Sequence, residues 1–401
     1  MITGIGLITP LAIGRDASWT LIKAGRTGTR RIRLITGEEV LGGPSPFAEL
    51  DADPRPFNRA TKMALWATSE ALADARVQLR CMDRARIGCV LGATGCPAAA
   101  TLIGVRQGDP QAFEAAYPSS TAAIVAREYG LKGPVLSPAA ACATGLFAVL
   151  RAAQCLEDDY CDLVLAGSAD ASLDIFTVSG FERLRVLAPR SAPAEHACRP
   201  FDRQRCGFVV GEGAAVFVME RMSQAIRRGA SIYAVLVGGI IGSDAYHITG
   251  LNPDPSGVAA LIRRCLWKNR LSATEVDYIN AHGTATKVND LTEAQAIRLA
   301  FGRHTERVKV SATKSMIGHL ICAAGGVELA VTALAVRDGY IPPTANLFDP
   351  DPECAIDCTP LHGVQKPIET ALKLSIAFGG HFGAAILRHP ACYAPAVRAA
   401  A

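Results

Sequence analysis

Short apolar runs alternate along the chain with alanine-rich stretches in which apolar residues recur every three or four positions. The apolar runs have the length and the flanking turn residues of buried strands, and they span residues 86–94, 161–170, 214–220 and 231–242. The alanine-rich stretches have the spacing of helices that bury one face, and they span residues 61–75, 145–157 and 257–269. This alternation predicts an α/β fold with layered sheets.

One pattern occurs twice. CATGLFAVLRA (142–152) is similar to CAAGGVELAVTA (322–333), since both place cysteine, alanine and glycine before a helical apolar stripe. The echo predicts two similar halves that meet near residues 220–230, and in this interpretation Cys322 is a structural relic of the repeat. We therefore expect a first half at 1–225, a second half at 226–390 and a loose tail at 391–401.

Composition narrows the possible functions. The 401 residues carry a net charge of +4 with both signs mixed, which is unlike a nucleic-acid-binding protein. The densest basic stretch, residues 25–33, is expected to be a solvated turn, with docking of an acidic carrier as the alternative. We find no long uncharged apolar stretch and no leader-like start, so we expect a cytoplasmic protein without a membrane span.

The thirteen cysteines are scattered and form no CxxC pair. Cys354 and Cys358 stand four apart, but no second cysteine pair accompanies them, so we expect no metal site. Reduced, buried cysteines of an intracellular protein are the natural interpretation. The glycine-rich stretch 207–213 lacks the Lys-Ser/Thr of a phosphate-binding loop.

Three residues are candidates for chemistry. Cys142 precedes a predicted helix, whose positive end favours a thiolate, although a lone cysteine in such a place is more often a core residue. His282 ends a predicted strand, and Thr284 and Thr286 alternate after it, so both threonines can face one pocket. His319 lies beside the second alanine-rich helix, where a neutral imidazole is favoured; a capping or core role is its alternative.

One cysteine and two histidines suit nucleophilic catalysis on a thioester. The thiolate would accept an acyl group. Two neutral imidazoles would stabilise negative charge on a carbonyl oxygen, as arises when a malonyl group loses carbon dioxide and becomes an enolate. This chemistry needs no metal and no organic cofactor.

Six stretches, in the same order along the chain, resemble the β-ketoacyl-[acyl carrier protein] synthase family, in particular the elongating type I/II ketosynthases of fatty-acid and polyketide synthesis. They are ACATG (141–145), RPFDRQRCGFVVGEGA (199–214), SDAYHITGLNPDPSG (243–257), NAHGTATKVND (280–290), TKSMIGHL (313–320) and AFGGHFGAAIL (377–387). The resemblance implies the thiolase fold, in which two βαβαβαββ halves form a five-layer αβαβα sandwich. It also implies a dimer.

The resemblance implies roles for the candidate residues. Cys142 matches the acyl-accepting nucleophile. His282 and His319 match the two histidines that hold the malonyl thioester carbonyl during decarboxylation. Lys314 matches the lysine that organises His319 through hydrogen bonds.

Further residues match supporting parts of such a site. The backbone N–H groups of Cys142 and Phe378 match the oxyanion hole, and the Phe378 ring matches the gate beside the nucleophile. Thr284 and Thr286 match the threonines that bind the phosphopantetheine arm.

Two acids, Glu328 and Asp290, match a network that supports the lysine. The residues alone favour different interpretations. The local pattern predicts that Glu328 is a solvated acid on a helix and that Asp290 is the N-cap of a helix that begins at LTEAQAI.

The chain also departs from the family pattern. Cys206 stands where relatives usually have aspartate, Ala140 replaces a threonine or serine, and His381 and Phe382 alter the C-terminal glycine-rich run. The region between residues 94 and 142 is shorter than usual. These changes indicate a divergent member of a specialised pathway, and they leave the acyl chain length open.

The leading hypothesis is a condensing enzyme that extends a Cys142-bound acyl group by two carbons from malonyl-carrier protein. Its partners would be acyl carrier protein and a second copy, or a second ketosynthase-like chain. Its substrates would arrive on 4'-phosphopantetheine without a separate cofactor. The alternatives are a non-elongating partner subunit like a chain-length factor, which generally lacks the cysteine, and a ketosynthase-like acyltransferase.

Overall fold

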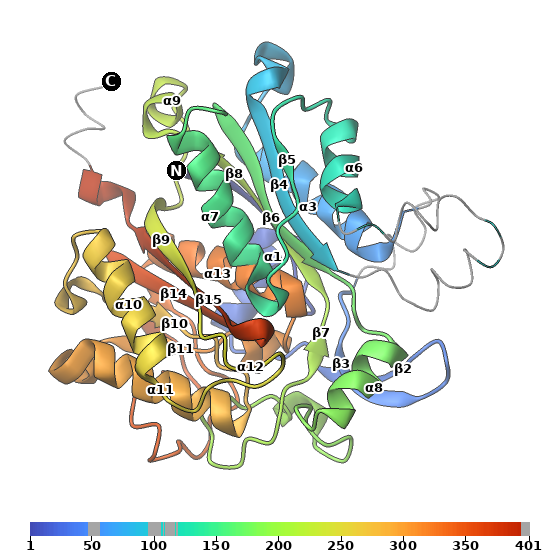
Figure 1. Ribbon diagram of the computed structural model, residues 1–401, viewed down its shortest axis with the longest axis vertical. Coiled ribbons are helices and arrows are strands. Elements are labelled where there is room, and N and C mark those ends of the chain that lie inside the picture. Colours follow the sequence, from blue (N-terminus) through green and yellow to red (C-terminus); the bar gives the residue numbers. More distant parts are fainter. Residues whose placement is uncertain (47–56, 95–105, 107, 109–116, 118, 394–401) are drawn as a thin grey trace.

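The fold consists of two five-stranded sheets with helices between them and on both outer faces (Figure 1). The computed structural model describes residues 1–46, 57–94, 106, 108, 117 and 119–393. Residues 95–105, 107, 109–116 and 118 of the shortened region between residues 94 and 142, and residues 394–401 of the expected tail at 391–401, lie outside the described part of the chain. Residues Pro390–Tyr393 form a 3-10 turn.

The first sheet contains strands from the N-terminal part of the chain. Its order is β1 (Ile2–Ile8), β8 (Gly213–Glu220), β6 (Leu163–Asp170), β4 (Ile87–Thr94) and β5 (Val135–Leu136). Strand β8 pairs antiparallel with both β1 and β6, while β4 pairs parallel with β6 and β5.

The second sheet repeats this arrangement. Its order is β9 (Val235–Ser243), β15 (His381–Arg388), β14 (Thr370–Ala377), β10 (Tyr278–Asn280) and β11 (Lys309–Ser311). Strand β15 pairs antiparallel with its two neighbours, and β10 pairs parallel with its two neighbours. Each sheet thus contains the first, fifth, fourth, second and third of its strands in chain order, which confirms the duplication expected from the sequence.

Five layers result. Helices α7 (Thr144–Glu157) and α13 (Ala324–Asp338) pack against both sheets and against each other. The outer helices are α3 (Arg59–Asp74) and α6 (Ser120–Glu128) on the first sheet, and α10 (Ser256–Lys268) and α11 (Lys287–Phe301) on the second (Figure 1). Helix α13 is buried from Ala324 to Val336, whereas α7 in the same layer exposes Arg151 and Gln154.

Shorter elements connect these layers. They are α1 (Arg15–Lys23), α8 (Ile175–Arg183), α9 (Met222–Arg227), α12 (Lys314–Ile317), β2 (Arg30–Arg33), β3 (Glu39–Gly43), β7 (Val210–Gly211), β12 (Tyr340–Ile341) and β13 (Val364–Gln365). In the part of the chain that the structure describes, no helix combines the length and the hydropathy needed to cross a bilayer.

Two segments differ from the sequence-based expectation. The arginines of the basic stretch 25–33 are solvent-exposed as expected, but Gly28 and Thr29 are buried, and the second half of the stretch forms β2 rather than a turn. Strand β9 begins later than residue 231, because the preceding Tyr233 and Ala234 form backbone hydrogen bonds with Ile2 at the edge of the first sheet. This short pairing links the two halves before the chain enters the second sheet.

The central helices meet at glycines. A Cβ atom at Gly145 would overlap the backbone nitrogen of Gly326 and the hydroxyl of Ser168. The N-terminal turns of α7 and α13 therefore approach more closely than any other residue would permit.

This contact predicts that Gly145→Ala destabilises the fold by about 1–3 kcal/mol, because the added methyl group must displace backbone. The midpoint of urea unfolding measures the change. Gly180→Ala in α8 is the matched control, since nothing lies within 4 Å of its Cβ position. That control should be neutral or stabilising by up to about 1 kcal/mol, and an equal loss in both variants would contradict the proposed close contact.

Candidate active site

One cavity of about 670 Å³ gathers the residues singled out from the sequence. The candidates that line it are Cys142, His282, Thr284, Thr286, His319 and Phe378. Lys314, Glu328 and Asp290 are buried behind its wall. The cavity therefore brings together residues from four separate regions of the chain.

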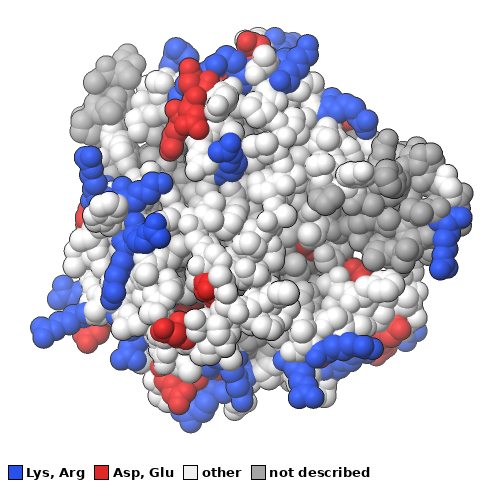
Figure 2. Space-filling view, viewed as in Figure 1, with Lys and Arg blue, Asp and Glu red and all other residues white. Residues whose placement is uncertain are grey.

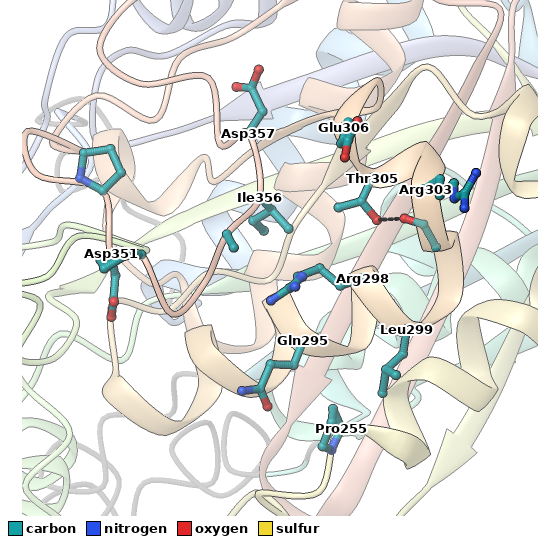
Figure 3. A pocket seen from close by; sticks show the side chains of 14 residues that line it. Pro255, Gln295, Arg298, Leu299, Arg303, Thr305, Glu306, Asp351, Ile356 and Asp357 are labelled. Carbon is teal, nitrogen blue, oxygen red and sulfur yellow. Dashed lines mark hydrogen bonds between the residues drawn. The ribbon is translucent and has the colours of Figure 1, made fainter.

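A larger groove of about 940 Å³ lies elsewhere, between α11 and residues 350–357 (Figure 3). Gln295 and Arg298 project into it from α11, and Asp351 and Ile356 lie on the opposite side. None of its lining residues is a cysteine or a histidine. It is therefore not the site of the cysteine chemistry.

A strained turn presents the cysteine. Cys142 belongs to the 3-10 turn η3 (Ala141–Ala143), directly before α7, and Ala141 has the left-handed φ of 46°. Such a backbone is unfavourable for a residue with a Cβ atom, so surrounding contacts must hold it. One of them is the hydrogen bond from the Ala140 N–H to the Thr144 hydroxyl, at 2.9 Å. The turn leaves the thiol only 8% exposed, at the wall of the cavity.

The same turn recurs before α13. Cys322 lies in η7 (Ile321–Ala323), and Ile321 has a φ of 43°. The Cys322 thiol is fully buried and donates to the Ala169 carbonyl oxygen at 3.4 Å. Cys322 therefore packs in the core, as the repeat pattern predicts.

His319 contacts Cys142 directly. Its Nε2 atom lies 3.0 Å from Cys142 Sγ, and its Nδ1 atom accepts the Ile321 N–H at 3.1 Å. Because Nδ1 is an acceptor, the ring proton of neutral His319 is on Nε2 and points at the sulfur. Burial, and after it the charges of Lys314 and Lys373, lower the pKa of His319 well below 6.5. The sequence predicted the neutral form from a helix end, whereas burial is its main cause.

His282 follows β10 on the same side of the cavity, and its ring lies 5.6 Å from that of His319. Its Nδ1 atom is 3.2 Å from the Lys314 ammonium, which also donates to the His282 carbonyl oxygen. An ammonium only donates, so Nδ1 accepts and Nε2 carries the proton. Burial, then the charge of Lys314, lower the pKa of His282 well below 6.5. The sequence paired Lys314 with His319, but its hydrogen bonds go to His282 instead.

A buried ion cluster holds Lys314. Its ammonium lies 2.5 Å from Glu328 Oε1, and Lys373 lies 2.7 Å from Glu328 Oε2. All three side chains are at most 1% exposed. Glu328 is therefore not the solvated acid that its position in a helical pattern suggested, because α13 is buried on every side. Lys373 was missed, although a lysine within the apolar strand TALKLSIA is a signal for a buried partner.

Asp290 serves a different group of contacts. It lies in the first turn of α11, after the N-cap Thr286, so it is not the N-cap. Its carboxylate accepts the N–H groups of Thr284 at 3.0 Å and Phe201 at 2.8 Å, and it lies 3.8 Å from Arg205 Nε. Asp290 thus fixes the loop after His282 and makes these contacts instead of sharing the Lys314 cluster.

A second acid, Glu293, was not singled out from the sequence. It lies one turn further along α11 and accepts the N–H groups of His282 at 2.6 Å and Gly283 at 2.8 Å. Burial raises its pKa to about 7. The spacing of Asp290 and Glu293, three residues apart on one helix face, was the available signal.

Phe378 closes the cavity beside the sulfur. Its ring centroid lies 6.2 Å from that of Phe181, and the next residue, Gly379, has a left-handed φ of 78°. The Phe378 backbone N–H faces the Cys142 thiol and lowers its pKa. On the opposite wall, the hydroxyls of Thr284 and Thr286 lie 2.8 Å apart.

The cysteine itself is protonated at rest. Burial raises the pKa of Cys142 to about 12, and the opposing effects of Lys314 and the Phe378 N–H are smaller. The helix end therefore does not produce the expected thiolate, because loss of hydration outweighs its effect.

The departures from the family pattern lie in different surroundings. Cys206 is exposed and lines the cavity. His381 pairs with Ser243 at the start of β15, and its ring packs edge-on against Phe147 at 6.0 Å. Phe382 is buried in the core of the second half. Within the described ranges there is no group of three or more side chains arranged to bind a metal ion.

Comparisons with known proteins agree with this geometry. Residues 1–225 match the family model "Beta-ketoacyl synthase, N-terminal domain", and residues 233–348 match "Beta-ketoacyl synthase, C-terminal domain". The chain belongs to the β-ketoacyl synthase family, whose members share the thiolase fold.

Among its relatives is the "Granaticin polyketide putative beta-ketoacyl synthase 1" of Streptomyces violaceoruber, 37% identical over 97% of this chain and 98% of the relative. The "Tetracenomycin polyketide synthase ketoacyl synthase alpha subunit" of Streptomyces glaucescens is 37% identical over 97% of both chains. The "3-oxoacyl-[acyl-carrier-protein] synthase 2" of Coxiella burnetii is 34% identical, over 96% of this chain and 97% of the relative.

Solved structures give the same result. A ketosynthase in complex with a type II PKS acyl-carrier protein superposes with a TM-score of 0.87 and 29% identity, over 96% of this chain and 98% of that chain. "The ishigamide ketosynthase/chain length factor" gives 0.87 and 30% over the same shares.

The state of the thiol yields a test. Because the pKa of Cys142 is about 12, we expect its alkylation by iodoacetamide to rise about tenfold per pH unit up to about pH 10 without a plateau. Mass spectrometry of the peptide that contains Cys142 measures the rate. In the urea-unfolded chain the same peptide should level off near the ordinary cysteine pKa of about 8.5. A plateau between about pH 7 and 9 in the folded protein would show that the helix end prevails over burial.

Proposed function

We propose that this chain is a β-ketoacyl-[acyl carrier protein] synthase that works in polyketide synthesis. The observation that carries the proposal is the contact between Cys142 Sγ and His319 Nε2, at 3.0 Å, in a cavity that holds a second neutral histidine. Relatives named as polyketide β-ketoacyl synthases, 37% identical over nearly the full length, support polyketide over fatty-acid synthesis.

Acyl transfer comes first. The Cys142 sulfur attacks the thioester carbonyl of an acyl-carrier protein, a carbon–sulfur bond forms, and the pantetheine thiol leaves with the proton of the cysteine. The backbone N–H groups of Cys142 and Phe378 act as the oxyanion hole. A protonated resting thiol suits this step, since the buried site is spared an unpaired charge until the thioester arrives.

Condensation follows. The Nε2–H groups of His282 and His319 donate to the thioester carbonyl oxygen of malonyl-carrier protein. The bond to the carboxylate breaks, carbon dioxide leaves, and the electron pair forms an enolate held by both donors. The enolate carbon attacks the acyl carbonyl on Cys142, and the carbon–sulfur bond breaks. The product is a β-ketoacyl chain two carbons longer, and Cys142 is free to regain a proton.

Supporting residues keep the two imidazoles in the donating form. Lys314, held by Glu328, occupies Nδ1 of His282 and, together with burial, keeps its pKa low, so the ring remains neutral. Neutral rings stabilise the enolate by hydrogen bonds without transferring a proton to it. We assign Asp290 a supporting role through the loop after His282.

The phosphopantetheine arm would bind along Thr284 and Thr286, whose hydroxyls line the cavity. The arm is covalently attached to acyl carrier protein, so the proposed reaction uses no separate cofactor. We also propose that the chain divides functionally at residues 225–226, with the nucleophile in the first half and both histidines in the second; the two family matches support this division.

A second ketosynthase-like chain is the proposed partner besides acyl carrier protein. The face over α7 and β9 carries few charged side chains at its centre (Figure 2). Strand β9 forms the edge of its sheet, and Ile241 on it is 46% exposed. Relatives described as an alpha subunit and as a ketosynthase/chain length factor support a heterodimer, with a homodimer as the alternative.

The proposal predicts two changes of mass, one in this chain and one in the carrier protein. With acyl-carrier protein, the intact chain should gain one acyl group, and with malonyl-carrier protein the carrier should then bear a chain two carbons longer. Cys142→Ala should gain no acyl group, whereas Cys322→Ala, which alters the equivalent turn, should still gain it. An adduct without extension would indicate an acyltransferase, or a subunit that needs its partner chain, and adding that chain distinguishes the two.

The role of His319 is tested separately. His319→Ala should slow release of carbon dioxide from malonyl-carrier protein by about 10²–10³-fold, the usual effect of losing one oxyanion donor. Acylation of Cys142 in the same variant serves as the control for folding. Unchanged carbon dioxide release would mean that the enolate charge is stabilised by other groups.

A further inference from the structure

A buried carboxylate lies near the nucleophile, on the side of the first sheet. Asp170 is the last residue of β6 and is fully buried. It accepts the N–H groups of Ser172 at 2.8 Å and Cys322 at 3.2 Å, and its carboxylate also bonds the Thr94 hydroxyl. None of the proposed reaction steps uses it.

The Cys322 N–H is linked to the proposed catalytic centre through the backbone of the preceding residue, Ile321. Cys322 follows Ile321, whose left-handed φ of 43° is unfavourable for a β-branched side chain. The Ile321 N–H is the donor that occupies Nδ1 of His319. A strained residue of this kind keeps its conformation only when neighbouring contacts hold it, and Asp170 holds the very next N–H.

We propose that Asp170 is a positioning residue for His319. By accepting the Cys322 N–H, it holds η7 in the conformation that keeps the Ile321 N–H on His319 Nδ1, so that the His319 proton stays on Nε2 and faces Cys142. This inference rests on the proposed function, because it gives His319 the role of a hydrogen-bond donor.

Comparison of the two halves supports this role. The last residue of β14, which corresponds to β6 in the second sheet, is Ala377. The equivalent turn before α7 is held by the Thr144 hydroxyl, without a carboxylate. A buried acid is therefore present only at the turn that orients a histidine. Asp170 occupies this position although its negative charge raises the pKa of the Cys142 thiol and so disfavours the thiolate.

Other contacts hold the His319 main chain independently. Its N–H donates to the Val209 carbonyl oxygen at 2.7 Å, and its carbonyl oxygen accepts the Gly211 N–H at 2.9 Å. The Phe208 ring lies 4.9 Å from the imidazole. Removal of Asp170 should therefore leave the His319 ring in its place and change only which ring nitrogen carries the proton.

A double-mutant cycle tests the proposal. Asp170→Ala should slow release of carbon dioxide from malonyl-carrier protein about 10- to 100-fold, the usual effect of losing an outer partner of a functional histidine. Acylation of Cys142 should not slow, because it needs no donor from His319 and because loss of the Asp170 charge lowers the pKa of the thiol. In the His319→Ala background, Asp170→Ala should cause no further loss. Additive losses, or equal losses in both half-reactions, would overturn the proposal.

Controls separate positioning from folding. Cys322→Ala keeps the N–H that Asp170 accepts and should retain full activity. Asp170→Asn keeps one carbonyl acceptor and should show a smaller loss; it replaces Asp170→Ala in the cycle if that variant does not fold.

A spectroscopic readout is independent of turnover. In ¹⁵N spectra of the histidine rings, His319 should be the Nε2–H tautomer in the unmodified protein and a mixture of tautomers in Asp170→Ala. If the unmodified protein releases no carbon dioxide, the proposed function fails while these spectra still decide the role of Asp170. An unchanged tautomer in Asp170→Ala would overturn that role.

Discussion

The close approach of two glycines at the centre of the molecule determines where every other part of the site can lie. Because Gly145 and Gly326 have no side chains, the N-terminal turns of α7 and α13 meet between the sheets. This brings Cys142, from the first half, within hydrogen-bond distance of His319, from the second. A bulkier contact would separate the nucleophile from its partner by more than a hydrogen bond spans.

Burial then sets the chemistry of both partners. Loss of hydration disfavours every charged form, so it raises the pKa of the Cys142 thiol and lowers the pKa of both histidines. The groups that would react are therefore neutral at rest, and a buried ion cluster lies behind the wall, where Glu328 contacts both Lys314 and Lys373. The hydrogen-bond donors of such a site are already in position when negative charge develops on the substrate.

The sequence was sufficient for the duplicated fold and for the residues that line the cavity, because apolar periodicity and short motifs are local properties. It was insufficient wherever the answer depended on burial. Glu328 looks solvated in a helical pattern, yet α13 lies between two sheets. A helix end suggested a thiolate at Cys142, whereas desolvation is the larger effect. Nor does spacing reveal which histidine Lys314 contacts, since that depends on how the two halves meet.

The duplicated turn has an evolutionary consequence. In each half, the turn before the central helix contains one left-handed residue followed by a cysteine, at Ala141–Cys142 and Ile321–Cys322. Since the cysteine of one half meets the histidines of the other, a half-length ancestor could have built this centre only by pairing with a copy of itself. With both halves in one chain this pairing is permanent, so one turn can carry Cys142 while the other holds His319.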